Sequence, residues 1–212
     1  MYARMSEITT ASPDTESPKR HDILCAAGDL FMRSGYGETS VDAIARAAGV
    51  SKATLYAHFP SKEALFATII HDACRTHLAV TSVLPEGVAD LRSALRGMGR
   101  DLLNFLLQDR ALAIHRVVTA ECQRFPELGR AFYDNGPGLF RRALAAWLER
   151  QQGAGRLRAG DMAVAADQFL GLLRSGLYLR ATLGLARPAE AEIDATVQEA
   201  VDTFLRAFAP PD

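Results

Sequence analysis

One stretch of the chain, Thr39 to Phe59 (TSVDAIARAAGVSKATLYAHF), constrains the fold more than any other. Thr39 and Asp42 have the spacing of a capping box, so we expect Thr39 to cap a helix that begins there. The apolar residues of this helix recur at helical spacing and form one face: Val41, Ile44, Ala45 and Ala48. Gly49 follows, and glycine readily takes the positive φ of a sharp turn. The stretch therefore opens with a short amphipathic helix that ends in a tight turn.

A second short helix is predicted directly after the turn, from Lys52 to His58, with Ser51 as its N-cap. Leu55 and Phe59 stand four residues apart and would both point inward. Ala45 is small at the place where the two helices would cross closely. This is the layout of a helix-turn-helix, whose second helix enters the major groove of DNA.

The outward face of this second helix suits contact with DNA. It offers hydrogen-bond donors, one charge and a flat ring, with small residues between them: Ser51, Lys52, Ala53, Thr54, Tyr56, Ala57 and His58. Side chains at the start of such a helix reach base edges, while long or hydroxyl-bearing side chains hold phosphates. The same spacing also describes a solvated helix of an all-α core, so the pattern alone leaves both readings open.

The flanking segments favour DNA binding. An amphipathic helix is predicted from Arg20 to Gly35, and Ser61 would cap another helix after Pro60. The run ILCAAGDLFMRSGYGETSVDAIARAAGVSKATLYAHFPSKEALF resembles the N-terminal domain of the TetR family of bacterial transcriptional regulators. The resemblance covers about Arg20 to Ile70 without gaps. It rests on the aromatic-x-x-x-Gly-Tyr helix end, Thr-Ser-Val-x-x-Ile-Ala, Gly-Val-Ser, Leu-Tyr-x-His-Phe and Ser-Lys-Glu-x-Leu.

The resemblance implies a regulator that binds double-stranded DNA, with Thr39 and Lys62 holding phosphates. Lys62 matches a family position that contacts phosphate, and a lysine near a helix N-terminus adds to the anion attraction there. Ala57 stands where some relatives carry a second aromatic residue, which puts one base contact in doubt.

Composition agrees with a soluble globular chain of one or two domains. Its 212 residues are 49% hydrophobic and 23% charged, with a net charge of −1. From Lys19 to Lys62 there are six basic and four acidic residues, so binding would depend on geometry and dimer avidity more than on a large basic field. We expect a cytoplasmic protein, since neither a signal peptide nor a membrane-spanning run is evident.

The cysteines Cys25, Cys74 and Cys122 lack metal-ligand spacing, so we expect small buried thiols and neither a metal site nor a cofactor. Redox sensing by Cys122 is the alternative. Catalysis is not expected, because no zinc, nucleophile-elbow or dinucleotide motif is present, although Glu121, Cys122 and His115 form a conceivable nucleophile cluster.

Three regions are predicted along the chain. Residues 1–18 are rich in Ser, Thr and Pro and should form a disordered arm, which in the resembled family can touch DNA. Residues 19–66 form the helix-turn-helix domain. Residues 67–212 form an all-α domain for ligand binding and dimerisation. Its helices are expected from Ser61 towards Thr81 and then at 89–107, 111–124, 127–151, 162–184 and 189–208, with a kink or division at Asn135-Gly136-Pro137.

The last two helices are predicted to form a dimer interface. The first is apolar nearly all round, and one chain of this size can cover it only partly. We therefore expect the pair to dock on its twofold mate as a four-helix interface; the alternative is the interior of a monomeric bundle. The residues assigned to this interface are Phe169, Leu172, Leu173, Leu177, Val197, Val201, Phe204 and Leu205.

A looser resemblance links ECQRFPELGRAFYDNGP and GRLRAGD to the ligand domains of regulators that include relatives of multidrug-efflux repressors. It implies a pocket in the bundle for a small, often hydrophobic effector. The lining candidates, each also explicable as an ordinary core residue, are Phe105, His115, Thr119, Cys122, Trp147, Arg174 and Tyr178. The sequence thus predicts a homodimeric regulator that a small molecule releases from a palindromic operator. Repression is usual in the family, and activation stays open.

Overall fold

A computed structural model describes residues 17–77, 88 and 90–210. Every regular element in that part of the chain is an α-helix, which confirms the all-α prediction. The N-terminal helices are α1 (Pro18–Ser34), α2 (Val41–Ala47), α3 (Lys52–His58) and α4 (Lys62–His77). The later ones are α6 (Leu91–Leu106), α7 (Asp109–Glu121), α8 (Pro126–Asn135), α9 (Pro137–Gly153), α10 (Met162–Leu173), α11 (Gly176–Thr182) and α12 (Glu190–Phe208).

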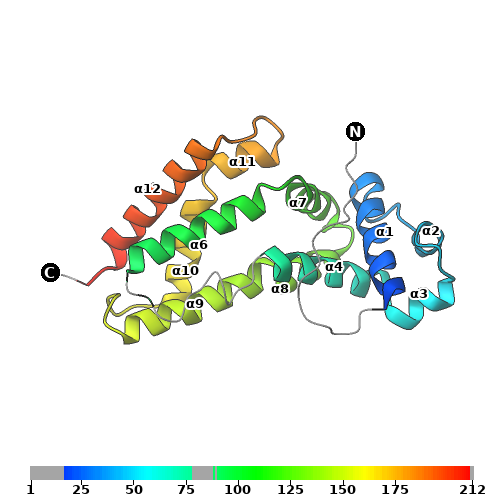
Figure 1. The fold of residues 1–212 in the computed structure, drawn as a ribbon, viewed down its shortest axis with the longest axis horizontal. Coiled ribbons are helices and arrows are strands. Elements are labelled where there is room, and N and C mark those ends of the chain that lie inside the picture. The colour runs from blue at the N-terminus through cyan, green and yellow to red at the C-terminus, as the bar shows by residue number, and fades with distance from the viewer. Residues whose placement is uncertain (1–16, 78–87, 89, 211–212) are drawn as a thin grey trace.

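The helices form two lobes joined by a central group. In Figure 1, α1, α2 and α3 lie together at one end, and α6, α9, α10 and α12 lie at the other. Between them stand α4, α7 and α8. The predicted helix-turn-helix thus sits at one extremity of an elongated molecule, where its outer surface is open.

Side-chain caps set several helix starts. Ser51 caps α3 by accepting the Thr54 N–H at 3.0 Å, and Ser61 accepts the Ala64 N–H at 3.1 Å, both as predicted. The predicted cap at Thr39 is wrong by one residue. Ser40 caps α2, because its hydroxyl accepts the Ala43 N–H at 3.1 Å.

Proline and glycine explain where two helices differ from expectation. Pro137 occupies the first turn of α9, where its missing N–H is harmless, so of the kink or division predicted there the structure has the division, between α8 and α9. The helix predicted over 162–184 is instead two helices, because the chain leaves helical geometry at Ser175 before Gly176. Glycine inside a helix costs about 1 kcal/mol relative to alanine, which favours a break at this point.

Two hydrophobic cores hold the lobes. The C-terminal core joins α6, α9, α10 and α12 and includes Leu95, Trp147, Phe169 and Phe204, all at most 1% exposed. The N-terminal core joins α1 to α4, but it also takes in side chains from the second half of the chain. These come from α7 and α8: Ile114, Val118 and Leu128.

The division of the chain into packing units therefore differs from its order in sequence. The helices α7 and α8 close the N-terminal core, although they lie more than forty positions beyond the predicted domain boundary at residue 66. The predicted arm, residues 1–18, lies outside the described residues up to position 16, and Pro18 already belongs to α1.

Candidate nucleic-acid interface

The turn between α2 and α3 has the geometry that the sequence predicts. Gly49 takes a φ of +65°, and the Val50 N–H donates to the Ala45 carbonyl at 3.0 Å. Ala45 is 4% exposed and Leu55 is completely buried. The two helices are thereby fixed against each other and against the N-terminal core, with one face of α3 left outside.

The exposed surface of α3 is called the reading face here. It comprises Lys52, Ala53, Thr54, Tyr56, Ala57 and His58. Lys52, Ala53 and Ala57 are exposed, Thr54 and His58 are half-buried, and the Tyr56 side chain is 45% exposed. Leu55 and Phe59 point inward as predicted, with Phe59 3% exposed. The reading face thus stands on a rigid apolar base, which is what recognition of base edges requires.

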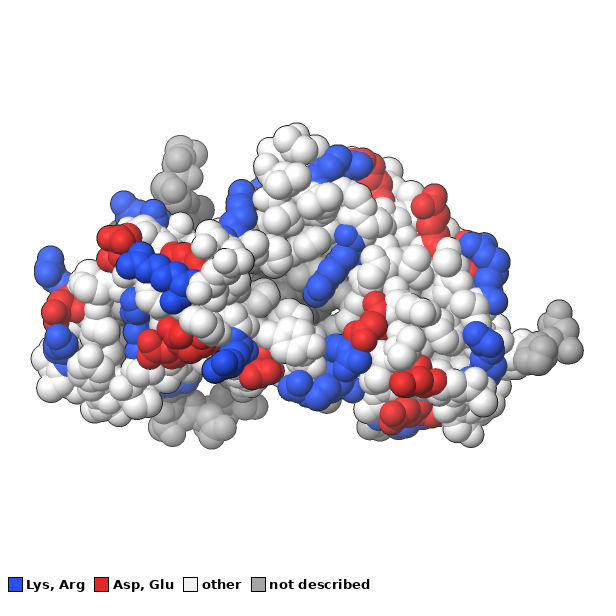
Figure 2. Space-filling model, turned by 180° about the vertical axis from the view of Figure 1, so that it is seen from behind, with Lys and Arg blue, Asp and Glu red and all other residues white. Residues whose placement is uncertain are grey.

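Two polar contacts organise the start of the reading face. The hydroxyls of Ser51 and Thr54 lie 2.8 Å apart, and the Lys52 ammonium lies 3.0 Å from a carboxylate oxygen of Asp42 on α2. The hydrogen bond and charge of Asp42 raise the pKa of Lys52. Basic and acidic side chains interleave at this end of the molecule in Figure 2 and form no single basic field. Recognition therefore depends on shape and hydrogen bonding more than on bulk charge.

The two predicted phosphate contacts outside α3 are turned inward. Thr39 is 2% exposed, and its hydroxyl donates to the Gly35 carbonyl at 2.7 Å. The Lys62 ammonium donates to the Tyr36 carbonyl at 2.8 Å and to the Thr39 carbonyl at 3.1 Å. It also lies 4.2 Å from the centre of the Tyr36 ring, and burial lowers the pKa of Lys62.

These contacts give Thr39 and Lys62 a structural role, because both fix the loop between α1 and α2, residues 35–40. The Lys62 ammonium has three N–H donors and uses two of them here. Contacts to DNA by Thr39, Lys62, Ser51 and the reading face remain predictions.

Glu121 makes the most important contact that the sequence did not reveal. Its carboxylate, at the end of α7, accepts the backbone N–H groups of Tyr36 and Gly37, each at 2.5 Å. A β-carbon at Gly35 would lie 2.6 Å from one carboxylate oxygen, and one at Gly37 would lie 2.8 Å from the other. Both glycines therefore permit a close approach. No local pattern could signal a contact between residues about 85 positions apart.

Aromatic rings surround this contact. The Tyr36 ring packs edge-to-face on Phe125 with centroids 5.4 Å apart, and the Tyr36 hydroxyl donates to Glu63 at 3.1 Å. Phe125 directly follows the turn at the end of α7. We name Glu121, Tyr36, Gly37, Lys62 and Phe125 the junction, because they join α7 to the α1–α2 loop and to α4.

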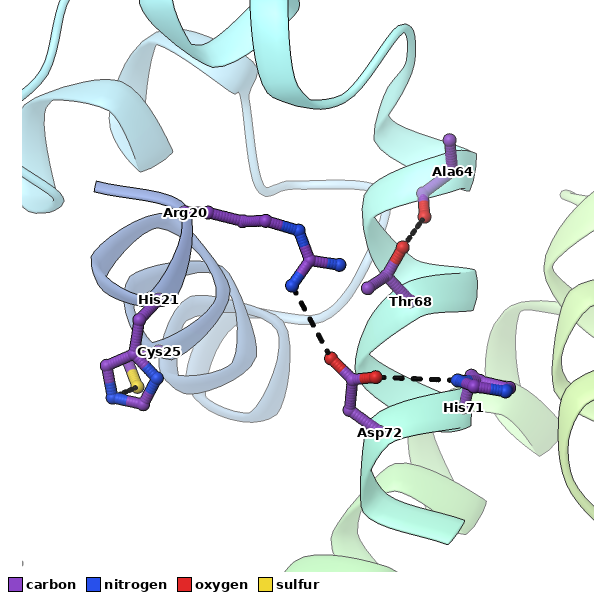
Figure 3. Close-up of polar contacts among 7 residues, drawn as sticks. All are labelled: Arg20, His21, Cys25, Ala64, Thr68, His71 and Asp72. Atoms are coloured by element: carbon purple, nitrogen blue, oxygen red, sulfur yellow. Dashed lines mark hydrogen bonds and ion pairs between the residues drawn. The ribbon is translucent and has the colours of Figure 1, made fainter. Parts of the chain in front are cut away.

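Polar contacts also hold α1 to α4. Figure 3 shows Arg20 of α1 reaching towards Asp72 of α4, with 4.0 Å between the charged atoms, and the same guanidinium lies over the Phe59 ring at 5.4 Å. On α4, the Thr68 hydroxyl donates to the Ala64 carbonyl, and His71 lies beside Asp72 (Figure 3). Arg20 thus lies inside α1 and contributes to the packing of the N-terminal helices.

The structure brings together three of the seven predicted ligand contacts. The His115 ring of α7 lies edge-to-face 5.8 Å from the Tyr178 ring of α11, and Arg174 at the end of α10 is close enough to lower the pKa of His115. Burial contributes most to that lowering. Phe132 of α8, which the sequence did not single out, packs on His115 at 6.1 Å.

The other four predicted ligand contacts lie elsewhere. Trp147 is 1% exposed within the C-terminal core, and Phe105 packs against that core. Thr119 is exposed, with its hydroxyl donating to the His115 carbonyl, and Cys122 packs against the N-terminal core. A small crevice between α1, α4 and α7 is lined by none of the seven, but by Gly28, Phe31, Met32, Phe66, Ile69, Arg110, Ile114 and Val117.

Most of the predicted dimer residues are buried within a single chain, which leaves them little surface for a second copy. Six are at most 4% exposed: Phe169, Leu173, Leu177, Val197, Val201 and Phe204. Leu172 and Leu205 are half-buried against the same core. Most apolar side chains of α10 and α12 are therefore buried within the chain itself. Large apolar side chains that remain exposed near these helices are Val164, Leu179, Leu183 and Leu185.

Two further searches bear on other classes of function. Within the described residues, no His, Cys, Asp and Glu side chains gather in a group that could hold a metal ion. Over the same residues, none of the helices combines the length and the apolar character that crossing a membrane would require.

Comparison with known proteins gives concordant matches. The family model described as "Bacterial regulatory proteins, tetR family" matches residues 23–69, and the model "AefR-like transcriptional repressor, C-terminal domain" matches residues 93–210. Among curated proteins, the chain is similar to the HTH-type transcriptional repressor Rv1474c of Mycobacterium tuberculosis (strain ATCC 25618 / H37Rv). That match is 27% identical over 173 residues, which is 82% of this chain and 87% of the relative.

Solved structures agree. The flavonoid-responsive regulator FrrA superposes with a TM-score of 0.79 at 41% identity, over 92% of this chain and 98% of that one. A TetR-family regulator from Mesorhizobium loti MAFF303099 superposes with a TM-score of 0.78 at 29% identity, over 92% of this chain and all of that one. These relatives are regulators and not enzymes, as predicted for this chain. The helix-turn-helix, the helical C-terminal lobe and the family matches together show that the chain belongs to the TetR family of bacterial transcriptional regulators.

Proposed function

We propose that the protein is a homodimeric repressor that binds a near-palindromic operator and is released from it by a small molecule. The observation that carries the proposal is the reading face, which presents Lys52, Thr54 and Tyr56 outward on a buried base. Two such faces related by a twofold axis read half-sites about 34–36 Å apart, or a multiple of that distance.

The dimer would form through the outer surface of α10, with its neighbours α11 and α12. Exposed positions along α10 recur at helical spacing: Val164, Gln168 and Gly171. Leu179 and Leu183 of α11 are 58% and 63% exposed. In Figure 2, charged side chains lie mainly around the margin of the lobe opposite the helix-turn-helix and leave uncharged surface between them. Such a surface suits a second copy of the chain.

The junction supplies the route from effector to reading face. Because Glu121 holds the loop that leads into α2, a shift of α7 would move the helix-turn-helix through that carboxylate and through α4, which packs on α8. The two heads of a dimer would then no longer fit both half-sites together, and avidity would be lost. An effector that turns mostly bound protein into mostly free protein must favour the released state by about 5 kcal/mol.

A response to a small molecule is supported by one relative in particular. FrrA, 41% identical over 92% of this chain, is named as flavonoid-responsive. The likeness extends across the C-terminal lobe as well as the helix-turn-helix, since it covers 98% of the FrrA chain. We therefore infer that the C-terminal lobe of this chain also receives an organic effector.

The test begins by selecting sequences that the purified protein binds from random DNA, and we expect a near-palindrome. Tyr56→Ala should then weaken binding to the selected site by about 1–3 kcal/mol more than binding to random DNA, because it removes a base-edge contact. The matched control is Tyr133→Ala, which removes a tyrosine of similar exposure (51%) on α8. If the protein enriches no sequence, or if Tyr56→Ala weakens both kinds of DNA equally, the assigned reading role of α3 fails.

A further inference from the structure

His115, Phe132, Arg174 and Tyr178, which we name the His115 cluster, come from four different parts of the fold. His115 lies on α7, Phe132 on α8 and Tyr178 on α11, while Arg174 is the residue that ends α10. The His115 ring meets the other two rings edge-to-face, at interplanar angles of 77° and 69°. The break between α10 and α11 thus places Arg174 near His115 and Tyr178.

Two polar atoms of this cluster are buried without a hydrogen-bond partner: Nε of Arg174 and Nδ1 of His115. A buried polar atom left unpaired costs about 1–3 kcal/mol, and more when the group is charged. Among the described residues, no carboxylate forms an ion pair with Arg174, whereas Arg141 and Arg180 each pair with one. The position of Arg174 at a helix C-terminus is favourable for a cation but does not satisfy its Nε–H.

Within the described part of the chain, the cluster holds a positive charge without a paired negative charge. Burial and the charge of Arg174 lower the pKa of His115, and Arg174 also opposes the rise that burial causes in the pKa of Tyr178. The neutral imidazole is thereby favoured, and Arg174 carries the positive charge of the cluster with no carboxylate paired to it among the described residues. A guanidinium whose Nε–H is buried and unpaired gains most from a planar anion, because its N–H groups match carboxylate geometry.

We propose that the His115 cluster is the effector site and that it binds a planar aromatic acid. The anionic group, a carboxylate or an ionised phenol, would accept from Nε of Arg174, and the aromatic body would pack against the rings of His115, Phe132 and Tyr178. This inference rests on the proposed function, of which it specifies the effector.

The same helix links this site to the reading face. His115 and Glu121 both belong to α7, six positions apart, which is about 9 Å along a helix. A ligand that wedges between the His115 ring and Phe132 would push α7 away from α8. That movement would draw the Glu121 carboxylate from the N–H groups of Tyr36 and Gly37, which it holds at 2.5 Å.

The test uses the full chain and a matched pair of probes, 4-hydroxycinnamate and its methyl ester, which keep the same ring and differ in charge. Calorimetric titration should show the acid binding more tightly than the ester. Arg174→Gln should weaken binding of the acid roughly 10- to 100-fold and leave the ester unchanged, since a charge-assisted hydrogen bond is lost. Arg180→Gln is the matched control, because Arg180 lies on the surface of α11 and pairs with Glu192 at 3.0 Å.

Several results would overturn the proposal. They are equal affinity for acid and ester, no binding of the acid up to about 10 mM, which leaves less than about 3 kcal/mol of affinity, or an unchanged acid affinity in Arg174→Gln. Arg174→Lys, which keeps the charge but not Nε–H, should retain part of the affinity and reports on the site if the glutamine variant folds poorly. Operator binding is measured separately: protein that binds its selected DNA but no acid refutes only the effector class. Protein that binds the acid but no DNA refutes the proposed function.

Discussion

At the residue scale, the carboxylate of Glu121 joins the two lobes by directional hydrogen bonds, which apolar packing alone does not provide. Its two oxygens accept the N–H groups of Tyr36 and Gly37. The carboxylate lies so close to the loop that neither Gly35 nor Gly37 has room for a β-carbon. Apolar contacts between α7 and the N-terminal core tolerate small sliding, whereas a two-pronged hydrogen bond fixes direction and distance. Glu121 therefore adds a directional contact to the apolar packing of α7 and α8 on the N-terminal core.

Glu121→Ala should lower the free energy of unfolding by about 1–3 kcal/mol, because two buried N–H groups lose their acceptor. Hydrogen exchange should accelerate at the amides of Tyr36 and Gly37 specifically. Glu38→Ala, at an exposed position of the same loop, is the control and should change neither. Unaltered exchange at both amides in Glu121→Ala would show that the carboxylate does not hold the loop in solution.

Lys62 distinguishes a structural role from a DNA contact. Lys62→Met should lower the free energy of unfolding by about 1–3 kcal/mol, since the carbonyls of Tyr36 and Thr39 lose a charged donor. Its effect on the salt dependence of DNA binding should be small. Lys52→Met should do the reverse: its pair with Asp42 is exposed and contributes little to stability, whereas loss of a phosphate contact lowers the salt slope by about 1. Denaturant unfolding and salt titrations give both quantities. A reduced slope with unchanged stability in Lys62→Met would restore its role at the phosphates.

His115 should make folding stability depend on pH. Burial and Arg174 lower its pKa in the folded state, so the unfolded chain binds the proton more readily. Stability should therefore rise as pH increases towards the unfolded pKa of about 6.5 and fall as pH drops below it. His115→Phe should flatten this slope in thermal melts between about pH 5 and 7.5. The surface variant His71→Phe should retain it, because the buried imidazole of His115 is still present. A slope that persists in His115→Phe would assign it to other groups.

At the scale of elements, local signals sufficed for α3, its turn and the extent of α12, but they did not reveal that the helix predicted over 162–184 divides into α10 and α11. Gly49, the Ser51 cap and the inward pair of Leu55 and Phe59 act within one or two helical turns, so the sequence reports them directly. The faces of α10 are different, because an apolar residue such as Phe169 shows that it is buried but not by which chain. The chain breaks at Ser175, so α11 is a separate helix, and other helices of the same chain cover the apolar residues of α10.

For the candidate site, too, the sequence predicted the features that depend on neighbouring residues and missed those that depend on distant ones. The reading face follows from helical spacing on a single short element. The inward turn of Thr39 and Lys62 and the clamp by Glu121 depend on where α1, α4 and α7 meet, and such contacts leave no trace in local spacing. His115 and Tyr178 were both candidates, but Phe132 joined them only through the packing of α8 on α7.

Gly171→Arg tests the outer surface of α10 as the dimer interface. Gly171 is exposed, and a β-carbon there would have open space around it, so the variant should fold. A charged side chain in the middle of the interface should split the dimer, and light scattering should report a monomer. Gly97→Arg, at an exposed glycine inside α6 with equally open space, is the matched control and should remain dimeric. A dimeric Gly171→Arg would locate the interface elsewhere.

At the scale of the whole molecule, the chain is an elongated body whose centre belongs to both lobes. The helix-turn-helix occupies one end, the C-terminal core occupies the other, and α4, α7 and α8 lie between them (Figure 1). The His115 cluster and the junction both include α7, so the proposed effector site and the loop before α2 share one rigid element. In a dimer held along α10, a small displacement of this helix would be carried to both operator half-sites at once.

The shared N-terminal core has a consequence for building chimaeric regulators. A graft that exchanges the first 66 residues between relatives at one crossover would part Phe31 and Phe66 from the partners that cover them, since Ile114, Val118 and Leu128 would come from the recipient. The incoming segment would pack against α7 and α8 of the recipient, and its loop would meet the recipient's side chain at position 121. New operator preferences should therefore be introduced by substituting the outward side chains of α3, and not by exchanging the whole helix-turn-helix domain.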